Sequence, residues 1–251
     1  DGIRSVAGTA RIGDVELGSV SRQIQSLISD IANSVNTFTI TSAVLRSKSQ
    51  YRLFYSASGA LSAEAKGIIG TITANGFEWS ETVGIQATGF TSGFDKDGVE
   101  QKYHGDNAGY IYNHDTGNSF TASGSAFNIN AIYQTPNFDF GDIGTRKTLQ
   151  YAKISITPEG DVQPSLRVRY DYEDVSIPQP EDYVLDSVPL PSLFGSGIFG
   201  TSIFGASNDP MLRQAVQGSG SVCSFRITSL DQNAPYAING LYINYVPSGR
   251  R

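Results

Sequence analysis

Turn signals repeat at short intervals between Asp97 and Phe120, and this spacing constrains the fold more than any other feature of the sequence. Asp97-Gly98 is expected to supply the positive φ that a two-residue primed turn requires. Asp106-Asn107-Ala108-Gly109 and Asp115-Thr116-Gly117-Asn118 are two further turn sequences. Apolar and polar residues alternate between the turns, so each short strand offers one face to a core. The segment is therefore predicted to form consecutive tight β-hairpins, as in a β-propeller blade or another β scaffold.

The composition is that of a folded, turn-rich β protein. Of the 251 residues, 39% are hydrophobic and only 17% are charged, and 27 are glycines. Thirteen phenylalanines and thirteen tyrosines add to the strand propensity. A chain of this length accommodates one large all-β domain or two smaller ones.

The charge and the cysteine count narrow the function classes. The formal net charge of −6 argues against binding nucleic acid by phosphate neutralisation, although an acidic surface suits a channel through which DNA slides without adhering. Cys223 is the single cysteine, which excludes an intramolecular disulfide and a cysteine metal cluster. No apolar run approaches the length of a membrane span. Because the chain begins at Asp1 without an initiating Met, we expect that further sequence precedes it.

One segment near the N-terminus has a helical period. Apolar residues recur at spacings of three and four from Leu17 to Val35. Ser19 or Ser21 can serve as the N-cap, and Asn33 lies near the expected end. The opposite face is rich in Ser, Gln and Asn and lacks the basic residues of a membrane-surface helix. We predict one amphipathic helix that packs on a sheet.

Residues 1–124 are predicted to form two blade-like antiparallel sheets in addition to this helix. Two blades cannot close a propeller ring, so two interpretations stay open. Either preceding sequence supplies further blades, or the region is a sandwich that resembles a propeller only locally. The expected strands are Phe38–Leu45, Tyr51–Ser56, Gly67–Thr73 and Phe77–Thr82 in the first sheet, and Ile85–Ser92, Val99–His104 and Tyr110–Asn113 in the second.

Residues 125–251 are predicted to form a β-sandwich, which makes the whole chain an all-β protein with one N-terminal helix. Prolines at four positions between Val175 and Pro191 exclude a central strand there and indicate an extended surface arm. The expected strands, which are longer than those of the first region, are Ser125–Thr135, Thr148–Thr157, Ser165–Glu173, Ala215–Ser229 and Tyr236–Val246.

A Phe-Gly pair recurs every five residues after the arm, at Phe194, Phe199 and Phe204. This period fits neither a helix nor a strand, and it places three aromatic side chains on glycine-rich joints. These three residues are candidate subunit-interface anchors, because aromatic side chains in a loop suit docking onto a neighbouring subunit. The alternative is that they cover one end of their own sandwich. The dinucleotide-binding pattern that starts at Gly195 is a coincidence of this repeat, since neither a strand nor a helix flanks it.

Both histidines, His104 and His114, lie within ten residues of each other, and Asp95 and Asp97 are nearby. By residue type, these four residues match the ligand set of a metal site. Aspartates in turns, however, are mostly used for backbone hydrogen bonds, and the remaining ligands of a calcium loop do not follow Asp95. We therefore predict hairpin turns here, and no metal and no cofactor.

Asp171 and Glu173 are a possible pair of catalytic acids, since glycosidases require only two carboxyl groups. Both are predicted to lie on one strand face together with Arg167 and Arg169, where they more often form exposed charge pairs. The sequence contains no nucleophile elbow, no HExxH motif and no phosphate-binding loop. We predict no catalytic residues and a protein that is not an enzyme.

Several runs together resemble a known family. They are HGDNAGYIYNHDTGNSF, IYQTPNFDFGDIGTRKTLQYAKISITPEGD, LRVRYDYED, the Phe-Gly repeat and GLYINYVPSGRR. The sequence from about Gly67 onward is similar to the C-terminal half of phage tail nozzle proteins, which are also called tail tubular protein B-like virion proteins.

This resemblance implies a structural subunit of the virion at the lower end of a short phage tail. Such subunits combine a β-propeller with added β domains and assemble as a hexameric ring, in contact with adjacent tail or adaptor proteins. The ring forms a tube that double-stranded DNA traverses during ejection without specific binding. The family is not enzymatic, so it implies no catalytic residue.

A glycan-binding or glycan-cleaving β-propeller or β-sandwich protein is the alternative function. Trp79, Tyr103, Tyr110 and Tyr112 would be its stacking surfaces, and Asp171 or Glu173 would supply its acid. A receptor-binding protein at the tail tip is a third possibility, and it shares the virion location with the first.

Overall fold

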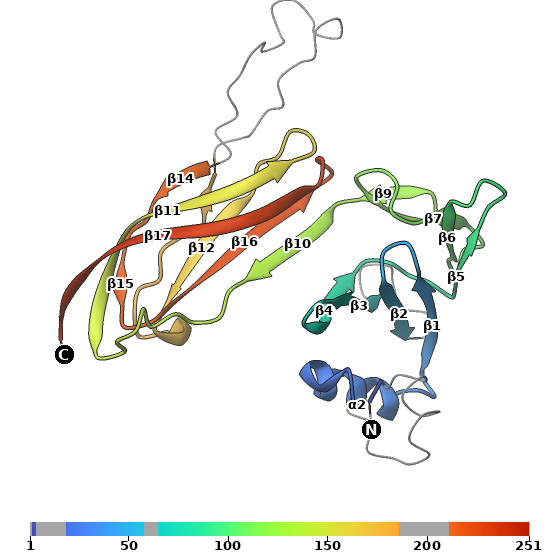
Figure 1. The fold of residues 1–251 in the computed structure, drawn as a ribbon, viewed down its shortest axis with the longest axis horizontal. Helices are drawn as coiled ribbons and strands as arrows, with labels where there is room; N and C mark the ends of the chain where they lie inside the picture. The colour runs from blue at the N-terminus through green and yellow to red at the C-terminus, as the bar shows by residue number, and fades with distance from the viewer. Residues whose placement is uncertain (1, 4–18, 58–64, 186–210, 251) are drawn as a thin grey trace, which may run out of the picture. The chain divides into compact units, whose positions relative to one another are not determined.

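The computed structural model describes residues 2–3, 19–57, 65–185 and 211–250. These residues are mostly β-strands in antiparallel sheets with one short α-helix, which confirms the predicted all-β class (Figure 1). The chain divides into two compact units, Asp1–Phe127 and Asn128–Arg251, whereas the sequence placed the boundary at residue 124. No helix among the described residues has the length and apolar character that a membrane span requires.

The first unit contains a four-stranded antiparallel sheet whose strands follow one another in chain order (Figure 1). Each strand agrees with its predicted range to within one residue, because the alternation of apolar side chains and the intervening turn residues specify both the strands and their ends. The strands are β1 (Phe38–Leu45), β2 (Gln50–Ala57), β3 (Lys66–Thr73) and β4 (Gly76–Val83).

The helix is shorter than predicted. A 3₁₀ turn, η1 (Arg22–Ile24), precedes α2 (Gln25–Asn33), and no side chain caps either one. The hydroxyl of Ser21, an expected N-cap, instead accepts a hydrogen bond from the backbone N–H of Ile3 at 2.8 Å. The helix packs on the sheet as expected, since Ile31 shares a buried cluster with side chains of β2 and β3.

A second, three-stranded sheet follows, and a two-stranded hairpin ends the unit. The strand predicted at residues 85–92 begins four positions later, at Gly89, and Ala87 before it is buried in an apolar cluster with Leu45 and Phe90. The described strands of this unit form separate open sheets, so the propeller stays a prediction. The remaining strands are β5 (Gly89–Phe94), β6 (Glu100–Gly105), β7 (Ile111–Asn113), β8 (Phe120–Ala122) and β9 (Ser125–Phe127).

The turns of this region occur where the sequence predicts them, but the first differs in type. Of the pair Asp97-Gly98 only Gly98 has a positive φ, at 77°, so the turn is not of the two-residue primed kind. The backbone N–H of Asp95 donates to the Val99 carbonyl at 3.0 Å just beyond the strand ends, so three residues, Lys96, Asp97 and Gly98, form the loop between this pair. Gly109 and Gly117 have the positive φ that the second and third turns require, at 86° and 73°.

The second unit consists of two antiparallel sheets, as the predicted sandwich requires (Figure 1). The first sheet has the order β10 (Ile129–Gln134), β16 (Cys223–Asp231), β12 (Ser165–Tyr170) and β13 (Tyr183–Val184). In the second sheet, β11 (Thr145–Pro158) pairs with β14 (Met211–Ala215), β15 (Ser219–Gly220) and β17 (Tyr236–Arg250).

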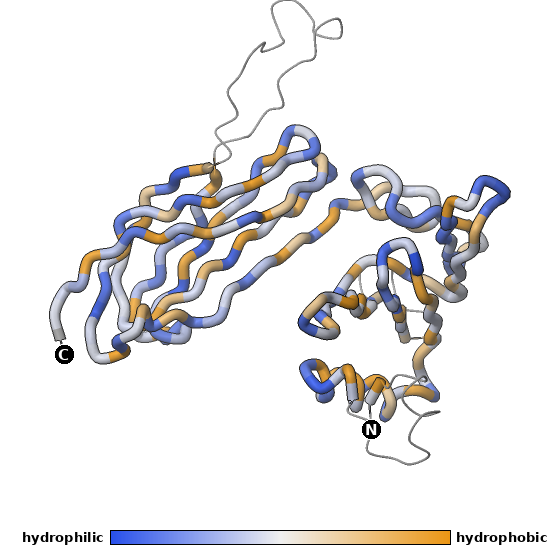
Figure 2. Tube along the Cα trace, in the orientation of Figure 1, coloured by the Kyte–Doolittle hydropathy of each residue, from blue (hydrophilic) through white to orange (hydrophobic). Residues whose placement is uncertain are grey.

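One apolar core lies between these two sheets. Alternate residues of β11, β12 and β16 face it, for example Ile154, Val168 and Phe225, all of which are fully buried. Hydrophobic and hydrophilic residues alternate along several of these strands (Figure 2). The alternation fixes the register, because a slip by one residue would move the whole apolar set of a strand to the solvent face.

Several predictions in this region are wrong in extent. The strand expected at residues 125–135 is divided between β9 and β10, which belong to different units. The strand expected at 215–229 is interrupted, so that β15 and β16 are separate. Part of the predicted surface arm, Tyr183–Val184, is edge strand β13, and Leu185 after it is buried in the core. Residues 186–191 of the arm lie outside the described residues.

Gly70 on β3 generates a stability prediction. A Cβ at this position would lie 2.6 Å from a ring carbon of Trp79, the single tryptophan, whose indole N–H donates to the Val20 carbonyl at 2.9 Å. Gly70→Ala therefore forces the indole to move, and we expect a loss of about 1–3 kcal/mol in the free energy of unfolding. Urea unfolding followed by tryptophan fluorescence measures the change.

The matched control is Gly93→Ala on β5, since a Cβ there would meet no atom within 4 Å. Equal stability losses in the two variants, with unchanged tryptophan emission in both, would contradict the packing of Trp79 on Gly70.

Candidate functional site

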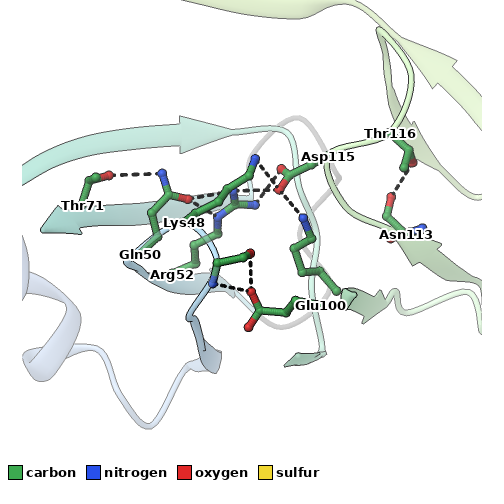
Figure 3. Close-up of polar contacts among 10 residues, drawn as sticks. Lys48, Gln50, Arg52, Thr71, Glu100, Asn113, Asp115 and Thr116 are labelled. Carbon is green, nitrogen blue, oxygen red and sulfur yellow. Dashed lines mark hydrogen bonds and ion pairs between the residues drawn. The ribbon is translucent and has the colours of Figure 1, made fainter. Parts of the chain in front are cut away.

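Three cationic side chains converge on Asp115, in the turn after β7 (Figure 3). Arg52 on β2, which is only 6% exposed, binds both carboxylate oxygens of Asp115, with Nη1–Oδ1 and Nη2–Oδ2 distances of 2.9 and 3.1 Å. The guanidinium also donates to the side-chain oxygen of Gln50. This two-pronged geometry is the strongest form of the arginine–carboxylate pair.

Two lysines complete the coordination of the same carboxylate. The Nζ atoms of Lys48 and Lys102 lie 2.9 and 3.1 Å from Oδ2 of Asp115. Burial would raise the pKa of Asp115, but the hydrogen bonds from Arg52 and the two lysines outweigh it and hold the pKa well below its usual range. Asp115 has a φ of 60°, so its backbone is in the left-handed region. We infer that this network holds the strained residue in place.

A second carboxylate joins the same two sheets. Glu100 on β6 is buried and accepts hydrogen bonds of 2.9 Å from the backbone N–H groups of Arg46 and Ser47, in the turn between β1 and β2 (Figure 3). The Ser47 hydroxyl donates to it as well, at 2.5 Å. The hydrogen bonds of Ser47 and Arg46 lower the pKa of Glu100. Glu100 and Asp115 therefore both fasten the second sheet to the β1–β2 hairpin.

The two histidines are packed against each other beside this network. The ring centroids of His104 and His114 are 4.5 Å apart in an edge-to-face arrangement, and the side chains are only 8% and 6% exposed. Phe54 and Phe90 contact the His114 ring, with centroids 5.4 and 4.8 Å away, and Tyr112 stacks on His104. The histidines are thus members of an aromatic cluster.

This environment favours neutral imidazole rings. Burial lowers the pKa of both histidines, and that of His114 falls to about 3 because electrostatic interactions with His104 and Arg52 add to the effect of burial. Nδ1 of His104 and Nε2 of His114 are buried without a hydrogen-bond partner. A neutral ring bears such an unpaired nitrogen at lower cost than a charged ring would.

Of the two aspartates that the sequence offered as metal ligands, Asp95 binds backbone groups and Asp97 forms an exposed ion pair. Asp95 accepts hydrogen bonds from the N–H groups of Asp97 and Val99, both at 2.9 Å. Asp97 is exposed and pairs with Lys96. No group of three or more His, Cys, Asp or Glu side chains in the described part of the chain could hold a metal ion.

The expected strand face that carries Asp171 and Glu173 does not exist. β12 ends at Tyr170, and the residues from Asp171 to Glu173 form a turn in which all three have a positive φ. Asp171 accepts hydrogen bonds from the backbone N–H groups of Ser221 and Val222, at 2.7 and 3.2 Å. The prediction that both acids share one strand face with Arg167 and Arg169 is therefore wrong, because the strand ends at Tyr170 and the next three residues have positive φ.

The aromatic residues of the glycan hypothesis are not one surface. Tyr103 and Tyr110 are exposed, but Tyr112 is turned inward and its hydroxyl donates to Asp106 at 3.0 Å. Trp79 lies on β4, in a different sheet of the unit. The candidate interface residues Phe194, Phe199 and Phe204 lie outside the described residues.

Sequence reasoning missed the Asp115 network because its members are far apart in the chain. Arg52 and Asp115 are separated by 63 positions, and only the sheet arrangement brings them together. Chemically, the network offers no free acid or base, because the carboxylates of Asp115 and Glu100 are both saturated with donors. It fits a structural tie between two sheets.

No protein-family model matches the chain, and a search of curated proteins gives no match.

The Asp115 network predicts a large stability effect. Asp115→Asn tolerates the left-handed backbone but leaves the buried Arg52 without its counter-charge, so we expect a loss of about 3 kcal/mol in the free energy of unfolding. Urea unfolding followed by Trp79 fluorescence measures it. Asp97→Asn is the matched control, because its pair with Lys96 is exposed, and we expect a change of at most about 0.5 kcal/mol. Similar losses of unfolding free energy in the two variants would contradict the role of the Asp115 network in holding the two sheets together.

The histidine pair predicts acid sensitivity. The pKa of His114 is 6.5 in a model peptide and about 3 in the folded chain, so the unfolded chain binds more protons between these values. Stability contributed by the neutral ring is complete above pH 6.5 and is lost as the pH falls towards 3, at about 1.4 kcal/mol per unit of pKa difference. The titratable and charged groups that act on this ring are His104, Arg52, Lys102 and Asp115.

His114→Phe keeps an aromatic ring in the cluster and removes the titration. We expect the variant to have a flatter dependence of unfolding free energy on pH between 6 and 4 than the wild type, as measured by urea unfolding at fixed pH values. Parallel curves for the two proteins would show that His114 does not titrate as described.

Proposed function

We propose that this chain is a non-enzymatic structural subunit of a phage tail, which self-assembles into a ring that forms a conduit for DNA ejection. The observation that carries the proposal is the edge strand β10. It contains no charged residue and pairs only with β16 among the described strands. Ile132 and Tyr133 on it are 59% and 51% exposed. Isolated proteins usually protect such edges with charge or proline, so an uncharged edge with exposed apolar side chains favours pairing with another chain.

The use of charge in the first unit supports the same proposal. Asp115 and Glu100 bind groups of their own chain, which makes the two sheets a rigid element rather than a reactive site. A rigid β element suits repeated assembly, in which each copy must present the same surface. The net charge of −6 suits a conduit for DNA, because an acidic wall does not retain phosphate groups.

The sequence resemblance supports the remaining parts of the proposal. It favours a hexameric ring in the tail of the virion, with adjacent tail or adaptor proteins as neighbours. It also favours passage of double-stranded DNA without specific binding. Phe194, Phe199 and Phe204 are the proposed interface anchors, since an aromatic residue every five positions in a glycine-rich segment suits insertion into a neighbouring subunit.

Glycan binding is a second candidate, favoured by the exposed rings of Tyr103 and Tyr110. A saturable signal on a glycan array that Tyr103→Ser abolishes would support it. Cleavage of glycans is less favoured, because Asp171 is held by two backbone N–H groups.

Assembly is the test of the preferred function. We expect native mass spectrometry of the chain to show a closed oligomer and electron microscopy to show rings. The triple variant with Phe194, Phe199 and Phe204 replaced by Ser should shift the distribution towards monomer without changing the urea midpoint. The matched control replaces Phe94 and Phe127, which are exposed outside this repeat, by Ser. A persistent wild-type monomer across salt and protein concentrations would overturn the proposal.

A further inference from the structure

Three arginines gather on the outer face of the first sheet of the second unit. Arg167 and Arg169 alternate with core-facing residues on β12, and Arg226 lies on the neighbouring strand β16. The strand register places Arg167 directly opposite Arg226. Like charges at directly opposed positions are unfavourable, so this arrangement requires anions to balance it.

Two carboxylates of the chain pair with these arginines, but one pair is close and the other contacts are long. Asp182 forms an ion pair and a hydrogen bond with Arg167. Arg169 and Arg226 share the single carboxylate of Glu173, whose Oε1 lies 3.4 Å from Nε of Arg169 and 3.9 Å from Nη2 of Arg226. Both distances exceed those of a charge-assisted hydrogen bond, which are about 2.7–2.9 Å.

The hydrogen-bonding capacity of Arg169 is not filled. Its Nε atom is buried and has no hydrogen-bond partner, although its side chain is 15% exposed as a whole. Burial and the positive charge of Arg167 lower the pKa of Arg169. Buried N–H groups of arginine are nearly always bonded, so an unfilled one facing an exposed sheet surface points to a missing acceptor.

Glu173 is held over the arginines by an unusual backbone. Asp171, Tyr172 and Glu173 have φ values of 47°, 61° and 62°, and a run of three non-glycine residues in the left-handed region is rare. The carboxylate of Asp171 anchors this turn through the N–H groups of Ser221 and Val222. Strained turns of this kind are concentrated at binding sites and switches.

We propose that Arg169 and Arg226 form a binding site for a phosphate-type oxyanion, and that Glu173 is an internal placeholder that the ligand displaces. Charge balance favours phosphate over a carboxylate. With Arg167 neutralised by Asp182, displacing Glu173 leaves two positive charges, which match the ≈ −1.5 to −2 charge of a phosphate group at pH 7. A carboxylate would only replace the single charge of Glu173.

The neighbouring strand orients one of the two guanidinium groups. Gln134 on β10 accepts hydrogen bonds from Nε and Nη2 of Arg226, at 2.8 and 2.6 Å. This contact fixes the plane of the guanidinium before any ligand arrives, which lowers the entropic cost of binding. The site does not depend on ring assembly, so its failure and that of the proposed function are distinguishable.

Titration of the chain with inorganic phosphate, followed by isothermal calorimetry at low ionic strength and pH 7.5, tests the site. We expect saturable binding by the wild type and at least tenfold tighter binding by Glu173→Gln, in which the competing charge is gone. Arg226→Lys keeps the charge but loses the planar donor geometry, so binding should weaken about tenfold. Arg213→Gln, which removes an arginine from exposed strand β14 of the other sheet, should bind phosphate as the wild type does.

A second arm uses O-phosphoserine, which carries the same dianionic group as a monoester. Tighter binding of the monoester than of phosphate identifies the ligand as a phosphate on a larger molecule, and the reverse identifies the free ion. No saturable binding of either probe by Glu173→Gln at millimolar concentration would overturn the proposal. Phosphate binding of wild-type affinity by both Arg226→Lys and Arg169→Gln in folded protein would overturn it as well, since the phosphate would then bind elsewhere.

Discussion

The pair between Arg52 and Asp115 is the interaction on which the first unit depends. A guanidinium that is almost completely buried needs a counter-charge at hydrogen-bonding distance, and Asp115 supplies both of its oxygens. Because Arg52 belongs to the first sheet and Asp115 follows the last strand of the second, the pair fixes one sheet on the other. The buried histidines lie beside it, and burial, together with repulsion from Arg52, lowers the pKa of His114 and favours the neutral ring.

The second unit uses a carboxylate in a related way. Asp171, like Asp115, has a positive φ and is held by donors from a distant segment of the chain. In the first unit the result is a saturated network, in which every carboxylate oxygen of Asp115 has a cationic partner. In the second unit, Glu173 follows the anchored Asp171, and its Oε1 atom lies 3.4 Å from Nε of Arg169 and 3.9 Å from Nη2 of Arg226. The Asp115 network is therefore a structural tie, whereas the long contacts of Glu173 leave the two arginines open to an external anion.

The sequence was sufficient where local chemistry decides the structure. Period-two alternation and the turn residues located Phe38–Leu45 to the residue, and the all-β class followed from the same pattern. It was insufficient where contacts between residues far apart in the sequence determine the structure. The Ser21 hydroxyl bonds to the N–H of Ile3 instead of capping the helix, and the opposition of Arg167 and Arg226 depends on a register between strands far apart in sequence. Neither contact leaves a periodic signal.

The edge strand and the arginine site are physically adjacent, which links the two proposals. β10 carries Gln134, and Gln134 orients Arg226. Pairing of another chain along the free edge of β10 would restrict the motion of this strand and hold the amide of Gln134 in place. An anion bound at Arg226 would in turn stabilise the strand against fraying. By thermodynamic linkage, any coupling between the two events is reciprocal, so a phosphate group that favours assembly must bind the assembled form more tightly by the same factor.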